Sequence, residues 1–208
     1  MYALVESGSI TSFPKGNRGI KIGDYNYPPA VFTLWSESER NAIGVYTVEI
    51  DNTNKKDEAW YINTDISYAF GSGKVTGTYG TATAKAHADT KWTQKEIDDG
   101  EAPSGADTNT VKNEGLKTVL IRNIKKQAEG ILNQTDWYVT RKTEKSTAIP
   151  SAITTHRDAV RTKQASMCTA ITDASDTPAL ETLYTVVNTA DEGDDPVYAR
   201  PLGVLPTL

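Results

Sequence analysis

The spacing of apolar residues changes from that of a strand to that of a helix near the middle of this chain. From Trp60 to Phe70, mostly apolar residues alternate with mostly polar ones, which is typical of a strand with one buried face. From Leu116 to Ile131, apolar residues recur every three or four positions, as on one side of a helix. The two patterns together favour an α+β fold, in which an antiparallel β-rich domain is followed by a helical hairpin or bundle and an extended tail.

A polar segment separates the two patterns. Residues 96–109 are rich in Asp, Gly, Pro and Ser, which favour turns and cannot bury apolar surface. We therefore expect a β-rich domain over residues 1–106 and a helical domain over residues 107–190. Residues 191–208 are expected to form an extended tail, which contacts its own domain or a neighbouring chain because several of its residues are aliphatic.

Two β-hairpins are expected in the first half of the chain. Residues 1–6 and 10–13 flank a Ser-Gly-Ser turn, and residues 60–79 contain a Gly-Ser-Gly turn between two apolar alternations. Glycine supplies the positive φ angle that such tight turns require.

One short helix is expected between the strands, over about residues 36–43. The Ser36 side chain can accept a hydrogen bond from the Glu39 backbone while the Glu39 side chain reaches back, which is a capping box. Gly44 can then adopt the left-handed conformation that ends many helices.

The second half predicts three helices, over about residues 111–134, 151–173 and 177–188. The third is expected to begin with Thr177 as its N-cap and Pro178 in its first turn.

The second of these helices carries a coiled-coil seam, in which residues repeat at steps of 4, 3, 4, 3 and 4. The seam residues are Ile153, Arg157, Val160, Gln164, Met167 and Ile171. Arg157 and Gln164 are unusual in such a seam, because polar residues there cost stability but fix register. They indicate association with another helix, either in a hairpin or around a symmetry axis.

A Thr-Asp-Trp segment follows the first long helix. A helix that ends near Leu132 leaves carbonyl groups without partners, and Thr135 and Asp136 can form a tight local turn there. Trp137 is then expected to be buried as a wedge between the two long helices. Arginines at positions 141, 157 and 161 are within reach of carboxylates in the same region, namely Asp136, Glu144 and Asp158.

Charge is distributed in blocks. Residues 1–108 have a net charge of −5, residues 109–164 carry 11 basic against 5 acidic residues, and residues 165–208 carry 1 basic against 7 acidic residues. A basic block followed by an acidic one can be compensated within one molecule or between subunits, so we do not expect nucleic-acid binding.

No motif predicts catalysis, a metal site or a cofactor. The Gly-Ser-Gly-Lys segment that begins at Gly71 lacks the first glycine and the Ser or Thr of a phosphate-binding loop. The acidic run over residues 191–195 lacks the alternating carboxylates of an EF-hand. No segment has the length and apolarity of a membrane span, so we expect a soluble protein with no membrane partner.

Two segments resemble tailed-bacteriophage proteins. The helix that ends on Leu132, the Thr-Asp-Trp segment, the entry at Pro150 and the spacing of Arg157 and Arg161 together resemble the C-terminal module of phage tail and tail-fibre assembly proteins. This resemblance covers about residues 115–165. In addition, the segment over residues 34–48 looks like an N-terminal segment of short tail or tail-fibre proteins.

The resemblance implies a structural role with no cofactor and no catalytic residue. The expected function is that of a baseplate, tail-fibre or adaptor protein in the virion tail, made in the host cytoplasm and docked to other tail proteins. We expect a homo-oligomer, and among the possible oligomers a trimer is favoured. The predicted docking residues in the helical half are Leu132, Thr135, Asp136, Trp137, Arg141, Pro150, Ile153, Arg157, Val160, Arg161, Gln164 and Met167.

An aromatic segment in the first half supplies three further docking candidates, Tyr25, Tyr27 and Trp35; packing against their own sheet is the alternative. Two other functions remain open for the whole chain. One is a tail-fibre assembly chaperone that is not retained in the virion, and the other is a tail-associated glycan-degrading enzyme, which would require paired carboxylates.

Overall fold

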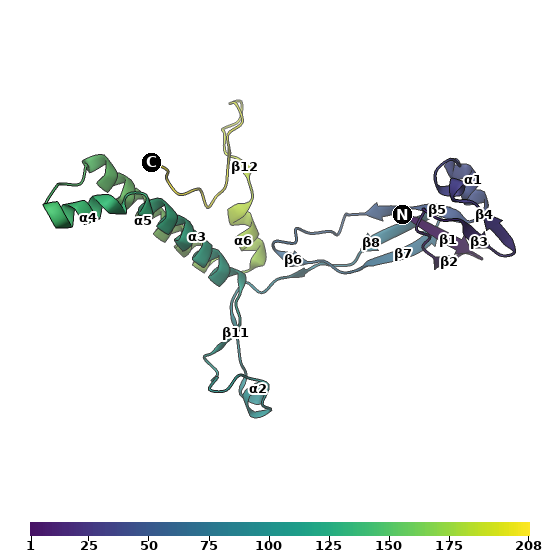
Figure 1. The fold of residues 1–208 in the computed structure, drawn as a ribbon, viewed down its shortest axis with the longest axis horizontal. Coiled ribbons are helices and arrows are strands. Elements are labelled where there is room, and N and C mark those ends of the chain that lie inside the picture. The colour runs from purple at the N-terminus through teal and green to yellow at the C-terminus, as the bar shows by residue number, and fades with distance from the viewer. The chain divides into compact units, whose positions relative to one another are not determined.

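The computed structural model describes residues 1–208 and confirms a mixed α+β fold (Figure 1). Contacts divide the chain into two compact units, Met1–Thr83 and Ala84–Leu208, which are described separately below. This boundary precedes the one expected after residue 106. The difference arises because the chain just after Thr83 caps the first long helix of the second unit, as shown below.

The first unit is built on a five-stranded sheet with the strand order β2-β1-β5-β8-β7. The strands are β1 (Tyr2–Glu6), β2 (Ser9–Ser12), β5 (Val45–Asp51), β7 (Ile66–Gly71) and β8 (Lys74–Tyr79). Neighbours are antiparallel except β5 and β8, which are parallel. The two edge strands approach each other, and the ring of Phe13, just after β2, packs against that of Tyr68 of β7 with centroids 4.8 Å apart, so the sheet is partly closed.

Both expected hairpins are confirmed. The β1–β2 turn consists of Ser7 and Gly8 at φ +50° and +78°, and the β7–β8 turn of Ser72 and Gly73 at φ +50° and +73°. Positive φ at both central residues defines the turn whose twist matches that of paired strands. The alternation ahead of the second turn is shorter than expected, because β6 (Tyr61–Ile62) ends before β7 begins.

The sheet buries apolar residues on both faces. One face holds Ala3, Val5, Val48 and Val75, and Leu4, which lies between Ala3 and Val5, points to the other face. On that second face a compact segment covers the sheet. It contains β3 (Ile20–Ile22), β4 (Tyr25–Tyr27), the 3-10 helix η1 (Pro29–Phe32) and α1 (Glu37–Ala42).

The helix α1 is confirmed with its expected start and end. The Ser36 side chain accepts from the Glu39 backbone, the Glu39 carboxylate accepts from the Ser36 backbone at 2.8 Å, and Gly44 adopts φ +81°. A Cβ on Gly44 would lie 2.5 Å from the Val5 carbonyl oxygen, so this glycine also permits the close approach of β1.

The second unit is centred on two long helices, α3 (Leu116–Asn133) and α5 (Ser151–Asp173), which pack side by side (Figure 1). The bounds of α5 are those expected from the sequence. Its seam is also confirmed: Ile153, Arg157, Val160, Met167 and Ile171 are the buried residues of α5, and Gln164 is half-buried. Because α3 supplies the opposing helix, the seam is used within one chain and no longer indicates a symmetric assembly.

The N-terminus of α3 is capped by a distant backbone segment instead of by a side chain of its own. The N–H groups of Leu116 and Lys117 donate to the carbonyls of residues 86 and 87, and the Gly115 N–H donates to the Asp89 carboxylate at 2.7 Å. These bonds satisfy N–H groups that a helix leaves without partners, and the hydrogen bond from Gly115, followed by that from Thr118, lowers the pKa of Asp89. They also attach the chain after Thr83 to the helical unit.

The expected first helix, residues 111–134, begins late. Val111–Asn113 forms strand β11, which pairs with β10 (Thr90–Lys91) in a two-stranded ribbon. A further short helix, α2 (Gln94–Asp98), overlaps the start of the expected polar segment. In addition, α4 (Asp136–Lys145) occupies most of the segment between the two long helices.

The expected third helix is shorter than predicted and has a different cap. The helix α6 (Thr177–Tyr184) is capped by Asp176, whose carboxylate accepts from the Ala179 backbone at 2.8 Å. Thr177 is instead buried and donates its hydroxyl to the Lys85 carbonyl at 2.6 Å. The last expected helical positions belong to β12 (Val187–Asn188), which pairs with β13 (Tyr198–Ala199).

The chain after β13 contacts its own unit. The Leu202 N–H donates to the Leu183 carbonyl at 3.0 Å, and the Leu202 and Leu205 side chains are buried. None of the helices combines the length and apolarity that crossing a membrane requires.

The helix α2 is fixed by a carboxylate with an unusually low pKa. Glu96 accepts from the backbone and hydroxyl of Thr93 and pairs with Lys112 of β11, whose ammonium group lies 4.7 Å from the Trp92 ring centroid. These hydrogen bonds, that from Lys112 first, lower the pKa of Glu96 to about 2.

We therefore expect the Glu96 carboxyl to titrate near pH 2 by carboxyl-detected NMR, and at a higher pH in Lys112→Ala, still below its ordinary value of 4.5 because the hydrogen bonds from Thr93 remain. Because the folded pKa is depressed, the contribution of Glu96 to local stability is complete above pH 4.5 and is lost as the pH falls towards 2. An unchanged titration in the variant would show that Lys112 does not hold this carboxylate.

Candidate docking site

The candidate site lies where α3 ends and α4 begins, and Arg157 of α5 holds it together. The Arg157 side chain is only 8% exposed. Its Nη1 donates to the Leu132 carbonyl at 2.8 Å and to the Thr135 hydroxyl at 2.6 Å, while Nη2 pairs with Asp136 at 2.8 Å. One guanidinium group therefore bridges the last turn of α3, the bend and the first residue of α4.

Thr135 is the buried residue of the bend, at 2% exposure. Its hydroxyl donates to the Leu132 carbonyl at 3.0 Å and accepts from Arg157, and its backbone N–H donates to the same carbonyl. The Leu132 carbonyl belongs to the group that a helix end leaves without helical partners, and the positive charge of Arg157 suits that negative end of α3. The chain therefore bends here because the bend gives hydrogen-bond partners to the Leu132 carbonyl and to the hydroxyl and N–H of Thr135.

The structure brings together four of the predicted site residues, Leu132, Thr135, Asp136 and Arg157. The expected pairing of Arg157 with Asp136 is present, and Arg161 pairs with Asp158 at 3.1 Å on the surface. Of the other predicted residues in this half, Pro150 precedes α5 as its N-cap residue, whereas Ile153, Val160, Gln164 and Met167 form the seam against α3.

The expected burial of Trp137 is wrong. Its side chain is 51% exposed, because the chain continues after Thr135 as the helix α4 and so carries the indole ring away from the corner that Thr135 fills. The Trp137 ring stacks on Tyr138 with centroids 3.8 Å apart. Arg141, one turn further along α4, places its guanidinium 4.8 Å from the Trp137 centroid and 5.3 Å from that of Tyr138.

We call Trp137, Tyr138 and Arg141 the aromatic–arginine cluster. Tyr138 was not among the predicted site residues. Its signal was present in the sequence, since Arg141 lies three residues after Tyr138 and four after Trp137, which is the spacing of neighbours on a helix. That signal is usable only when the segment is recognised as a helix, and α4 was not expected.

Replacing Trp137 by alanine should lower the free energy of unfolding of the helical unit by only about 1 kcal/mol. This is the scale of one exposed stacking and one cation–π contact, whereas removing a buried Trp costs about 3 to 5 kcal/mol. Urea unfolding followed by helical circular dichroism measures the difference. A loss of more than about 3 kcal/mol would support the buried wedge instead.

The aromatic candidates Tyr25, Tyr27 and Trp35 belong to the first unit. The Trp35 ring packs edge-on against Tyr27 at 5.9 Å, and both side chains pack against the apolar cluster under η1. Tyr25 is 72% exposed. Packing against their own sheet therefore accounts for Trp35 and Tyr27, while Tyr25 is free to contact another molecule.

No group of three or more His, Cys, Asp or Glu side chains is arranged to hold a metal ion. Comparisons of the chain with protein-family models, with curated proteins and with solved structures find no match.

Proposed function

We propose that this chain is a structural component of a bacteriophage tail, in the baseplate or as a fibre or adaptor protein, and that it acts by docking to other tail proteins. The observation that carries the docking role is the aromatic–arginine cluster, which α4 displays on a corner fixed by the buried Arg157. Trp, Tyr and Arg are the residue types that contribute most to protein–protein binding energy. The phage assignment itself rests on the sequence resemblance.

The rigidity of the corner supports the same role. A docking surface loses less entropy on binding when its side chains are already ordered, and the Arg157 contacts order the backbone that carries the cluster. The two adjacent rings, tilted by 31°, offer an apolar surface, and Arg141 offers a cation beside it. The surface therefore suits a tail protein that presents an aliphatic patch next to a carboxylate.

Mass spectrometry of purified virus particles tests the proposal. The chain should be present in mature tails at a fixed number of copies relative to the other tail proteins. Its absence from mature particles, together with its presence in infected cells on free fibre proteins, would contradict a tail component and support the chaperone.

A further inference from the structure

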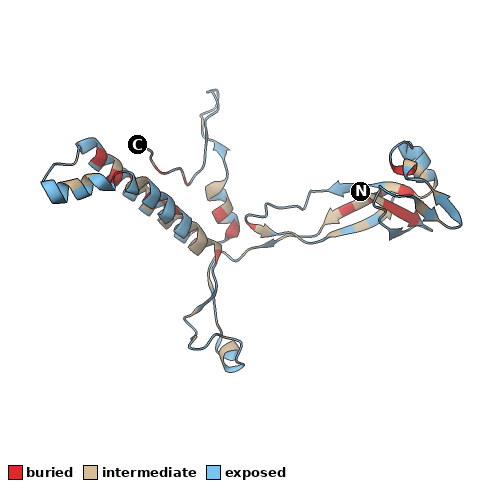
Figure 2. Ribbon diagram, viewed as in Figure 1, coloured by how far each residue is buried: buried red, intermediate tan, exposed pale blue.

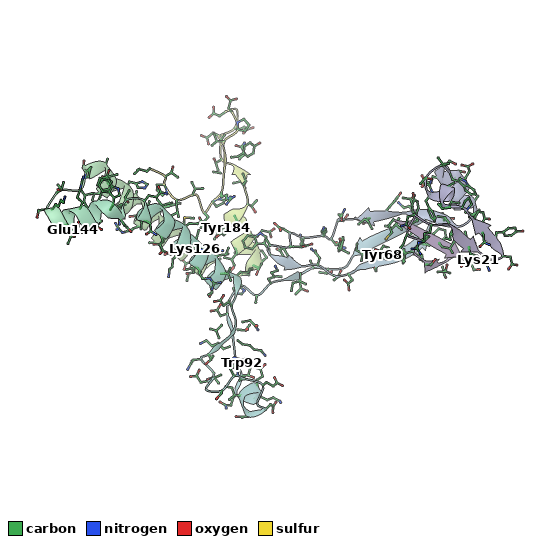
Figure 3. The ribbon with its side chains drawn as sticks, viewed as in Figure 1. Lys21, Tyr68, Trp92, Lys126, Glu144 and Tyr184 are labelled. Atoms are coloured by element: carbon green, nitrogen blue, oxygen red, sulfur yellow. The ribbon has the colours of Figure 1, made fainter.

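The two sides of α3 that flank its contact with α5 are unequally covered. On one side, the C-terminal segment from Leu202 to Leu205 lies against Leu120 and Ile124 of α3 and Met167 of α5, leaving a small cavity of about 170 Å³. Tyr184 of α6 completes this side (Figure 3). This side is therefore occupied by the chain itself.

The other side of α3 is an open, solvent-facing surface of this helix, which we call the basic flank. It is lined by Thr118, Ile121, Arg122, Lys125, Lys126 and Glu129. Ile121 and the alkyl stems of the long side chains give it an apolar floor, while three cations against one carboxylate give it a basic rim. Arg122 is already held by Glu114 at 2.6 Å, which leaves Lys125 and Lys126 as the exposed cations of the rim.

The β12–β13 ribbon has the complementary character. Its loop carries Asp191, Glu192, Asp194 and Asp195 without any basic residue, and all four are exposed. Its strands and their neighbours expose four large apolar side chains, at 40% to 70% of their full area. These side chains belong to Val186, Val187, Val197 and Tyr198.

Such a ribbon is expected to gain stability from contact with another surface. An isolated two-stranded hairpin is marginally stable in water. Val187 pairs with Ala199 and Asn188 pairs with Tyr198, so Val187 and Tyr198 point to opposite faces, and each face of the ribbon exposes apolar side chains. Figure 2 shows this ribbon almost entirely in the exposed colour. In the helical unit, the basic flank combines an apolar floor with a basic rim. A second basic surface with apolar residues, around Phe13, Lys15, Arg18 and Lys21, belongs to the first unit.

We propose that the acidic β12–β13 ribbon of one copy docks on the basic flank of α3 in a second copy. The apolar residues on one face of the ribbon would lie against Ile121, and the carboxylates of the loop would face Lys125 and Lys126. This contact goes beyond the proposed tail function, because it uses neither the aromatic–arginine cluster nor the phage resemblance.

The α3 helix of a second copy is a better partner for the ribbon than the α3 helix of the ribbon's own chain. The base of the ribbon is fixed by the Leu202 to Leu183 hydrogen bond, and the chain that leaves it covers the Leu120 side of α3. At 100° per residue, positions 118, 122, 125 and 129 lie on a different side of the helix from positions 120, 123 and 127.

The contact joins two different surfaces, so copies associate head to tail, and they close into a ring or extend into a filament. A ribbon of this size buries less than a standard interface, and we expect a micromolar Kd. The exposed charges mainly steer and orient the copies, so added salt should weaken association without abolishing it.

Charge reversal on the full chain tests this contact. Sedimentation equilibrium should show the mass of the wild type rising above 22.6 kDa with concentration. K125E/K126E on the flank and D194K/D195K on the ribbon should each weaken association at least tenfold. The variant that combines all four substitutions should recover it, because the reversed charges are again complementary. K142E/K145E, an equal charge change at exposed lysines of α4, should associate like the wild type.

A wild type that stays monomeric at all concentrations would overturn the proposal. Normal association of K125E/K126E or of D194K/D195K would also overturn it, as would a combined variant that stays monomeric. Circular dichroism checks that every variant keeps its helices. Where a reversal disturbs them, the neutral pairs K125Q/K126Q and D194N/D195N replace it and should weaken association at least fivefold. The proposed tail function would be contradicted by a different result, namely the absence of the chain from virus particles.

Discussion

Replacing Arg157 by alanine should lower the free energy of unfolding of the helical unit by about 3 kcal/mol, the lower end of the cost of breaking a buried ion pair. The guanidinium group is buried, and its removal leaves the Thr135 hydroxyl and the Leu132 carbonyl without their cationic donor. The cost is at the lower end because Asp136 is 52% exposed and can be solvated when its partner is removed.

One further variant separates the charge from the geometry at position 157, and a second serves as a control at a neighbouring arginine. Arg157→Lys keeps a cation but offers a single point of charge where three acceptors are bridged, so we expect it to recover only part of the loss. Arg161→Ala removes the neighbouring surface arginine of the same helix, whose pair with Asp158 is exposed, and should cost under about 1 kcal/mol. Urea unfolding followed at the helical dichroism band measures all three, and equal losses for Arg157→Ala and Arg161→Ala would refute the role of Arg157.

Replacing Gly115 by alanine should lower the free energy of unfolding of the same unit by about 2 to 3 kcal/mol, the cost of forcing an added methyl group into a packed site. The new Cβ would lie 2.3 Å from the Ala88 carbonyl carbon and 2.4 Å from its oxygen. Both are backbone atoms of the segment that caps α3, so the segment must move and weaken its hydrogen bonds to the Leu116 and Lys117 N–H groups.

The same helix contains a matched control. Gly130 lies in the interior of α3, and a Cβ added there would meet no atom within 4 Å. Gly130→Ala should therefore raise the free energy of unfolding by about 0.5 to 1 kcal/mol, because alanine is the better helix former. If both substitutions shift stability in the same direction, the cap of α3 does not depend on the close approach at Gly115.

Where a short pattern determined the structure, the sequence was sufficient to predict it. The Ser36–Glu39 capping box and Gly44 fixed α1 at both ends. The seam spacing gave the buried face of α5, including Arg157, although its partner is α3 of the same chain and not another subunit. These features depend on residues within a few turns of each other, so local patterns contain them.

Long-range contacts account for most of what the sequence did not show. Nothing near Lys85 indicates that its carbonyl accepts from Thr177, or that residues 86–89 cap α3, so the unit boundary at Thr83 was not predictable. The helix α2 is a different case. Its Thr93–Glu96 capping box was visible, but the surrounding Asp, Gly and Pro residues favoured a linker.

The corner at Thr135 was identified correctly as a bend, but its buried residue was not. Size favoured Trp137 for the buried position, whereas hydrogen bonding selected Thr135, whose hydroxyl can donate to Leu132 and accept from Arg157 at once. An indole N–H could not have done both. The exposed ring then became available to the aromatic–arginine cluster.

The most direct test of the docking account is the amount of chain incorporated into virus tails by the W137A/R141A variant, measured by quantitative mass spectrometry of purified particles. The matched control is K142A/K145A, which removes two exposed cations from the same helix. We predict that W137A/R141A keeps its helical content but falls at least tenfold in particles, while the control equals the wild type. Equal incorporation of both variants would contradict a docking role for the aromatic–arginine cluster.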